Sequence, residues 1–194
     1  IDNEQVYYYI SLMNENYEQP PKPEGADEGI LKGMYKFRGS EKAEAQILGS
    51  GAILTEAIQA ADLLKEQFGV EANVWSVTSY KNLIEDALDA DRNERFPDLG
   101  KKAPWIFQCL ENESGPVVAA SDYMKVLPAS LAKWIPGELV PLGTDGYGRS
   151  DGREALREHF EVDAKSIAHA VLVSLGKDAS ALNLPTDKPN PVNE

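Results

Sequence analysis

Four charged side chains with the spacing to form a polar site follow an apolar run in the last third of the chain. Asp145, Arg149, Asp151 and Arg153 come after residues 139–142, a run typical of a buried strand. In open α/β sheets ligands bind outside the carboxyl ends of the strands, so this loop is a candidate site. The same residues also fit a self-contained turn, in which Asp145 accepts hydrogen bonds from loop amides and Asp151 caps the next helix. The residues alone leave both interpretations open.

The middle of this loop is suited to a contact with another domain. Gly146 and Gly148 can supply backbone angles that other residues resist, which leaves Tyr147 as the bulky side chain that projects. Arg149 is placed to pair with Asp145, with Asp151 or with a carboxylate of a partner. We therefore predict that these residues form a structural and interface loop that faces a neighbouring domain or subunit. The alternative is a local turn with Tyr147 lying on its own domain.

Other patterns that carry chemistry are incomplete. Residues 49–51 (GSG) lie between a strand and a helix, but the third glycine of a dinucleotide fingerprint is replaced by Leu54. His159, at the border of a buried helix face, and His169, on the side opposite Ile167, are interpreted as structural or interface histidines. Cys109 lies among apolar residues and is interpreted as a core thiol. We predict no catalytic, cofactor-binding or metal-binding residue in the chain.

The composition excludes several classes of partner. The 194 residues carry a formal net charge of −13, with a pI near 4.6. This charge argues against nucleic acid and against anionic membranes, and no apolar run is long enough for a membrane helix. A single cysteine allows no internal disulfide, which fits a cytoplasmic protein. Because the chain begins abruptly with Ile1, we expect a piece of a longer protein.

From about residue 43, apolar runs alternate with helical patterns. We expect strands at 45–48, 73–78, 105–110, 117–120 and 139–142, and helices at 53–68, 80–90, 123–135, 152–161 and 164–176. The break between the third and fourth strands is too short for a crossover helix, so these strands should pair antiparallel. The sequence thus predicts a three-layer α/β/α fold with a mixed five-stranded sheet, mostly parallel with one antiparallel edge strand.

The chain divides into three parts by composition. Residues 1–40 contain a stretch rich in proline and acidic residues and are predicted to be an arm or linker from a preceding domain. Residues 41–182 are predicted to form the α/β domain. Residues 183–194 hold three prolines and are predicted to be an extended tail.

Six stretches of the sequence resemble motifs of one family. They are spread over nearly the whole chain and occur in the order expected for that family. The longest is residues 143–163 (GTDGYGRSDGREALREHFEVD). The others are residues 6–17 (VYYYISLMNENY), 23–35 (PEGADEGILKGMY), 48–54 (LGSGAIL), 75–79 (WSVTS) and 120–125 (ASDYMK). With these motifs the chain resembles the C-terminal domain of the homodimeric pyruvate dehydrogenase, the decarboxylating first component of the bacterial pyruvate dehydrogenase complex.

The resemblance implies a transketolase-like C-terminal domain. It also implies a parent enzyme that uses thiamine diphosphate and Mg²⁺, decarboxylates pyruvate and reductively acetylates lipoyl groups. The implied partners are the preceding domains of the same chain, a second copy of the chain, and dihydrolipoamide acetyltransferase with its lipoyl domains. In this family the preceding domains hold the cofactor and metal, and their Gly-Asp-Gly motif is absent from this sequence.

Three functions follow as competing hypotheses. The first is a non-catalytic domain that supports dimer assembly and active-site architecture, and that alone neither binds thiamine diphosphate nor decarboxylates pyruvate. The second is an acidic docking module for another subunit of the complex. The third, an independent nucleotide-binding reductase, is disfavoured by Leu54 and by the incomplete catalytic patterns.

Overall fold

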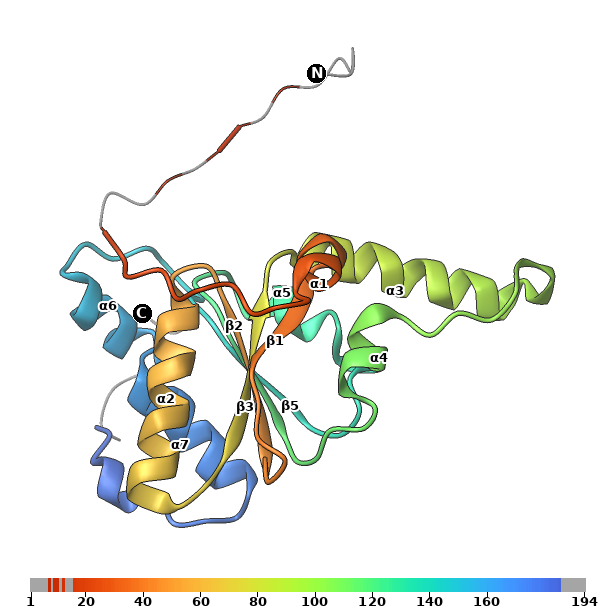
Figure 1. Cartoon of the computed structure of the whole chain (residues 1–194). Coiled ribbons are helices and arrows are strands. Elements are labelled where there is room, and N and C mark those ends of the chain that lie inside the picture. The colour runs from red at the N-terminus through yellow and green to blue at the C-terminus, as the bar shows by residue number, and fades with distance from the viewer. Residues whose placement is uncertain (1–6, 8, 11, 13–15, 186–194) are drawn as a thin grey trace.

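One mixed sheet with helices on both faces forms the body of the protein in the computed structural model, which describes residues 7, 9, 10, 12 and 16–185 (Figure 1). The strands are β1 (Met34–Arg38), β2 (Ala45–Ser50), β3 (Ala72–Val77), β4 (Val117–Ala120) and β5 (Leu139–Leu142). The α-helices are α1 (Asp27–Lys32), α2 (Ile53–Phe68), α3 (Tyr80–Arg95), α4 (Trp105–Leu110), α5 (Val126–Ala129), α6 (Arg153–His159) and α7 (Ala164–Ser174). Three short 3₁₀ helices are η1 (Pro97–Leu99), η2 (Ala132–Trp134) and η3 (Ser180–Leu182).

The strand order is β1-β3-β2-β4-β5. Four strands run parallel, because β2 pairs in parallel with both β3 and β4, and β4 pairs in parallel with β5. Strand β1 pairs antiparallel with β3 at one edge. The predicted fold class, a mixed five-stranded sheet with one antiparallel edge strand between helical layers, is confirmed.

The predicted strand at 105–110 is wrong, because these residues form helix α4. Ile106 and Leu110, four residues apart, are buried, whereas Gln108 between them is exposed, which is the pattern of a helix rather than of a strand. The predicted antiparallel pairing of 105–110 with 117–120 is wrong for the same reason. Helix α4 lies on the face of the sheet that α3 also covers (Figure 1).

Strand β1 supplies the antiparallel edge instead. It lies inside the segment 1–40 that we predicted to be an arm, so this prediction is wrong for residues 34–38. Met34 is opposite Val77 and Lys36 is opposite Trp75, and the Met34 side chain is fully buried. Burying Met34 and completing backbone hydrogen bonds along β3 both favour pairing over an extended arm. Residues 186–194 of the predicted tail lie outside the described residues.

Two apolar cores flank the sheet. One holds α2 and α7 against the sheet, and the other holds α3 and α4 (Figure 1). The inner face of α2 is rich in alanine, and a Cβ on Gly49 would lie 2.9 Å from the Cβ of Ala57. Close packing of the turn against α2 therefore requires glycine at position 49, which gives this turn a role in packing.

The helix ends use recognisable caps. Ser79 accepts a hydrogen bond from the amide of Asn82 at the start of α3, and Asp163 accepts one from Ser166 at the start of α7. Gly69 ends α2 in the left-handed conformation. Helix α3 continues to Arg95, beyond the predicted end at residue 90. Among the described residues, we find no helix with the length and apolar character that a membrane span needs.

Candidate functional site

Two loops are tied together at the carboxyl ends of the neighbouring strands β4 and β5. The amide of Thr144 donates to the carbonyl of Tyr123 at 2.9 Å, and its hydroxyl donates to the carbonyl of Asp122 at 2.8 Å. The amide of Lys125 donates to the carboxylate of Asp145 at 2.9 Å. A Cβ on Gly143 would lie 2.4 Å from the carbonyl oxygen of Tyr123, so only glycine permits this approach.

Asp145 therefore has a different partner from the one we predicted. We expected it to accept hydrogen bonds from amides of its own loop, but it accepts from Lys125 in the loop after β4. The bond connects two loops and holds the 143–152 loop in place from outside. Arg149 is exposed, and its pairing with Asp145 or Asp151 stays a prediction.

Asp151 does not cap helix α6. Its carboxylate accepts from the adjacent amide of Gly152 at 2.7 Å, and Gly152 itself is the N-cap residue of α6. The helix begins at Arg153, one residue later than a cap at Asp151 requires, so the predicted cap is wrong. Asp151 is exposed, as expected for a residue that closes a local turn.

The glycines around Tyr147 have different backbone conformations. Gly146 has a φ of 88°, which favours glycine as predicted, whereas Gly148 stays outside the left-handed region. Tyr147 is 81% exposed and projects from the loop. The alternative in which Tyr147 lies on its own domain is therefore wrong. Whether a second domain covers Tyr147 stays a prediction.

The loop after β4 carries further exposed apolar side chains. Tyr123 and Met124 of this loop and Val126, the first residue of α5, are each more than half exposed, and we call these three residues together with Tyr147 the interface patch. Exposed apolar groups gathered on connected loops are typical of interaction surfaces. Sequence reasoning missed the first three, because we placed them in a helix over 123–135. That helix is in fact reduced to α5 and η2, and only the adjacency of β4 and β5 brings the two loops together.

A small cavity of about 180 Å³ lies beside these loops. Its polar lining comes from Asp122, Thr144, Arg153 and Arg157, and its apolar lining from Ala52, Ile53, Leu156, Phe160 and Val162. Of the four charged residues proposed as a polar site, Arg153 alone lines this cavity. The structure thus places Asp145 in a loop contact, Asp151 in a local turn and Arg153 in the cavity wall, and does not bring the four together.

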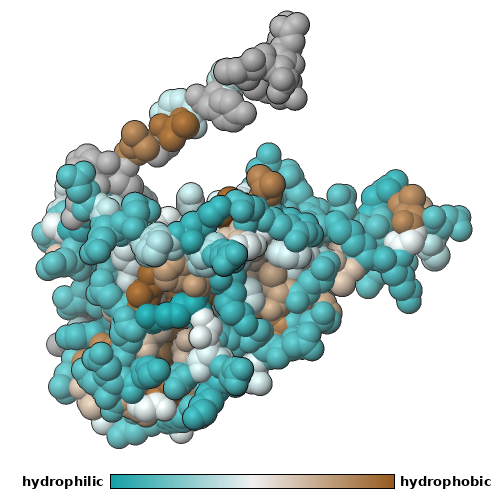
Figure 2. All heavy atoms as spheres, viewed as in Figure 1, coloured by the Kyte–Doolittle hydropathy of each residue, from teal (hydrophilic) through white to brown (hydrophobic). Residues whose placement is uncertain are grey.

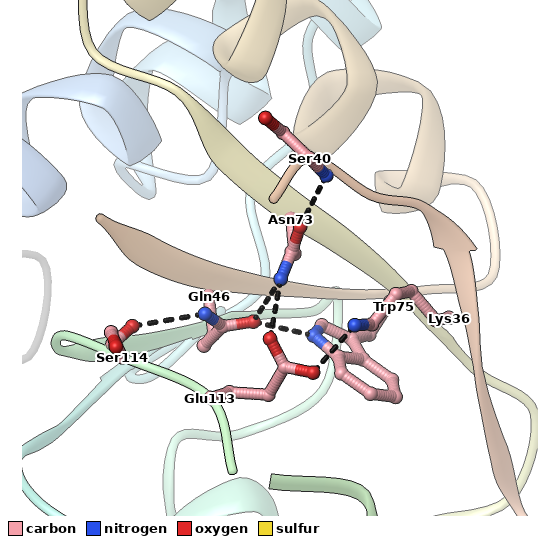
Figure 3. Close-up of polar contacts among 7 residues, drawn as sticks. All are labelled: Lys36, Ser40, Gln46, Asn73, Trp75, Glu113 and Ser114. Atoms are coloured by element: carbon pink, nitrogen blue, oxygen red, sulfur yellow. Dashed lines mark hydrogen bonds and ion pairs between the residues drawn. The ribbon is translucent and has the colours of Figure 1, made fainter. Parts of the chain in front are cut away.

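A second polar constellation is buried between the strands near their amino ends (Figure 3). Gln46 and Asn73, 1% and 0% exposed, form its centre. The Gln46 side-chain oxygen accepts from Asn73 at 3.0 Å and from the Trp75 indole at 2.9 Å, and its nitrogen donates to the Ser114 carbonyl at 2.9 Å. The amide groups of both side chains are used, which is the signature of a structural network.

The edge of this network is charged. Asn73 also donates to Glu113 at 2.7 Å and accepts from the amide of Ser40 at 2.8 Å. Glu113 forms an ion pair with Lys36 of β1 (Figure 3). The network thus ties β1, β2, β3 and the turn before β4 to one another, and we assign it a structural role.

Side chains that could bind a metal or act as a nucleophile were predicted to have structural roles. No three His, Cys, Asp or Glu side chains there are arranged to hold a metal ion. Cys109 lies in α4, partly buried, and burial raises its pKa to about 12. A thiol with this pKa is a poor nucleophile at neutral pH. His159 packs edge-on against Phe160 with ring centres 4.8 Å apart, which fits a structural role.

Comparison with known proteins now defines the class. The family described as transketolase-like TK C-terminal domain matches residues 33–163 of this chain. Solved transketolases share the fold: that of Campylobacter jejuni has a TM-score of 0.52 at 19% identity, over 74% of this chain and 19% of that one. A transketolase of Pichia stipitis has a TM-score of 0.54 at 21% identity, over 78% of this chain and 20% of that one. The chain belongs to the transketolase-like C-terminal domain family.

The sequence relatives are more specific. A Pseudomonas aeruginosa protein named pyruvate dehydrogenase E1 component is 45% identical over 90% of this chain and 20% of its own length. The Escherichia coli K12 protein of the same name is 44% identical over 97% of this chain and 23% of its own length. The resemblance inferred from the sequence is confirmed. The chain spans about one fifth of the length of these curated relatives.

Proposed function

We propose that the chain is the C-terminal domain of a cytoplasmic, thiamine-diphosphate-dependent pyruvate dehydrogenase. The parent enzyme would decarboxylate pyruvate and reductively acetylate lipoyl groups of dihydrolipoamide acetyltransferase. The observation that carries this proposal is the 44–45% identity to pyruvate dehydrogenase E1 components over 90% or more of the chain. Identity spread over a whole domain supports a shared role better than a short motif does.

In this proposal thiamine diphosphate and Mg²⁺ are held by parts of the parent enzyme that precede this domain. In the family that the chain resembles, the preceding domains hold both groups, and the Gly-Asp-Gly motif of those domains is absent from this sequence. Calorimetry of the 194-residue chain with thiamine diphosphate and Mg²⁺ should therefore give no binding heat, and micromolar affinity would contradict the assignment.

We propose that the domain itself supports assembly of the parent enzyme. The support is the interface patch of Tyr123, Met124, Val126 and Tyr147, which is exposed in this chain and fixed by the tie between its two loops. The proposed occupants are the preceding domains or the second copy of a homodimer. Burial of large aromatic and apolar side chains of this kind stabilises interfaces.

An acidic docking role for the acetyltransferase is the second candidate. Its support is the net charge of −13, and hydrophilic residues cover most of the face shown in Figure 2. Complementary charge mainly accelerates association and makes it sensitive to salt. If this domain docks the acetyltransferase, binding should weaken steeply between low and physiological salt and on replacement of exposed acidic residues by alanine. Binding that is insensitive to both would contradict this role.

The whole proposal is tested on the longest natural chain that contains this domain. The purified protein, given thiamine diphosphate, Mg²⁺ and pyruvate, should acetylate a lipoyl domain of its acetyltransferase. A lipoyl domain whose lysine carries no lipoyl group is the matched control. Absence of pyruvate-dependent acetylation would refute the proposed function.

A further inference from the structure

Tyr17 connects the N-terminal segment to a helix more than 130 positions later in the chain. Its hydroxyl accepts hydrogen bonds from the guanidinium groups of Arg153 and Arg157, each at 3.0 Å. The Arg157 guanidinium also lies 5.8 Å from the centre of the Tyr17 ring. The segment containing Tyr17 crosses the amino-terminal end of α2 before it reaches α1 (Figure 1).

The two arginines are suited to a shared acceptor. They are four residues apart on α6, so their side chains lie on one face, where like charges repel. A tyrosine hydroxyl oxygen can accept from both donors at once. Its contact with two cationic groups gives charge-assisted hydrogen bonds, which are stronger than bonds between neutral groups.

The position of Arg157 is fixed by a buried carboxylate. Glu56 of α2, only 9% exposed, binds the Arg157 guanidinium at 2.8 Å through one oxygen. Its other oxygen accepts from the amide of Ala164 at the start of α7 at 3.0 Å. Arg157 is therefore held by a contact that does not involve Tyr17. A preorganised partner loses little freedom when the tyrosine docks.

The chain that follows Tyr17 is stiff. Pro20 and Pro21 come three and four residues later and fix their own backbone φ angles. Residues 16–21 also form one wall of an open groove of about 1060 Å³, with α2 and the α6–α7 region as the other walls. A hydrogen-bonded residue next to a stiff stretch sets the direction of the chain more effectively than the same bond in a flexible one.

We propose that Tyr17 is a positioning residue of the parent enzyme. Held between Arg153 and Arg157, it fixes where residues 16–21 lie against α2 and α6. Helix α6 directly follows the loop that carries Tyr147, so the same contact fixes that segment relative to the interface patch. The consequence for catalysis rests on the proposed function, whereas the anchoring of the segment does not.

The anchoring is measured by electron spin resonance on the full natural chain. Nitroxide labels attached through ketone-bearing unnatural residues at positions 18 and 89 report the distance between the segment and α3, both exposed positions. We expect one narrow distance distribution in the unmodified protein and at least a doubling of its width in Tyr17→Phe. Tyr9→Phe is the matched control, because Tyr9 is 91% exposed in the same segment, and it should keep the narrow distribution. An unchanged width in Tyr17→Phe would overturn the anchor.

A double-variant cycle shows whether the two arginine bonds act through Tyr17. Arg153→Met leaves the Arg157 bond to Tyr17 in place, so it should broaden the distribution less than Tyr17→Phe does, and added to Tyr17→Phe it should broaden the distribution no further. Additive broadening would show that Arg153 acts on the segment by another route and would overturn the anchor as drawn.

The effect on catalysis separates positioning from stability. Tyr17→Phe should lower kcat for pyruvate about fivefold, because small displacements of catalytic parts slow turnover, and should leave KM within twofold. Its melting temperature should stay that of Tyr9→Phe. Broadened distances with unchanged kcat would overturn the positioning role. If the unmodified chain lacks pyruvate dehydrogenase activity, the proposed function fails, and the distance measurement still decides the anchor.

Discussion

The carboxylate of Asp145 accepts a hydrogen bond from the backbone amide of Lys125, with 2.9 Å between oxygen and nitrogen. The two residues follow neighbouring strands, β5 and β4, whose pairing brings their carboxyl ends together. The loop that carries Tyr147 is thus fixed by a contact with the next loop. A long-range tie of this kind gives a surface loop a defined shape without regular secondary structure.

Removing this tie should destabilise the domain. Asp145→Ala leaves the amide of Lys125 without its acceptor, and we expect a loss of about 1–3 kcal/mol in the free energy of unfolding. Urea denaturation followed by circular dichroism measures it. Asp145→Asn keeps a side-chain oxygen and should lose less.

Asp151→Ala is the control for this loop. Asp151 is exposed and binds only the adjacent Gly152 amide among the contacts of its carboxylate that the structure describes. Exposed substitutions of this kind usually change stability by about 0.5 kcal/mol or less. If Asp145→Ala lowered the free energy of unfolding no more than Asp151→Ala does, the tie between the loops would not stabilise the domain.

The strands and helices with clear periodicity could be predicted from the sequence, and two short segments could not. The run 105–110 (WIFQCL) is apolar at most positions, and a six-residue apolar run fits a strand as well as a buried helix turn. Its assignment as α4 depends on packing against α3. Strand β1 was missed because its partner β3 lies about 40 residues later, and nothing local in the sequence reveals that pairing.

The candidate site was predicted in part. The composition of the 143–152 loop indicated the exposed Tyr147 and the special backbone at Gly146, because glycine and aromatic residues have local meanings. The partner of Asp145 could not be found in this way, since Lys125 becomes its neighbour only through the order of the strands. Tyr17 was likewise missed, because its contact with α6 spans most of the chain.

Substitutions in the buried amide network should destabilise the domain more than substitutions of other polar groups in the core. Gln46→Leu keeps the approximate volume but leaves the Trp75 indole N–H and the Ser114 carbonyl without their partners. We expect a loss of about 2–4 kcal/mol, from the buried indole N–H left unsatisfied and from the lost bond to the exposed Ser114. Gln67→Leu, at an exposed position of α2, should change stability by about 0.5 kcal/mol or less. Equal midpoints in urea for the two variants would contradict the role of the network.

The thiol of Cys109 should be unreactive in the folded protein. Burial raises its pKa from 9.0 to about 12, so at pH 8 the folded chain holds about a thousandfold less thiolate than the unfolded chain. Alkylation by iodoacetamide should be slower in the same proportion and should accelerate with pH until about pH 12. The folded state retains this proton between pH 9 and 12 while the unfolded state releases it, so stability should fall as pH rises through that range.

The control for the thiol prediction is the same chain in urea, where Cys109 should react at the rate of a free cysteine. Cys109→Ser should show no alkylation in either state. A reaction in the folded protein as fast as in urea would show that the thiol is ionised or exposed, and that burial does not govern its pKa.

Tyr147 tests the proposed assembly role directly. The side chain is 81% exposed, so Tyr147→Ala should leave the melting temperature of this 194-residue chain within about 1 °C. In the longest natural chain the same substitution should weaken dimerisation at least tenfold or lower turnover, because truncation of a central aromatic residue is costly at an interface. Leu88→Ala, which truncates a large exposed side chain on α3, should change neither dimerisation nor turnover. Sedimentation measures the dimerisation, and an assay with pyruvate measures the turnover. If Tyr147→Ala lowers the melting temperature of the 194-residue chain and leaves dimerisation and turnover intact, Tyr147 stabilises its own domain and the interface role is wrong.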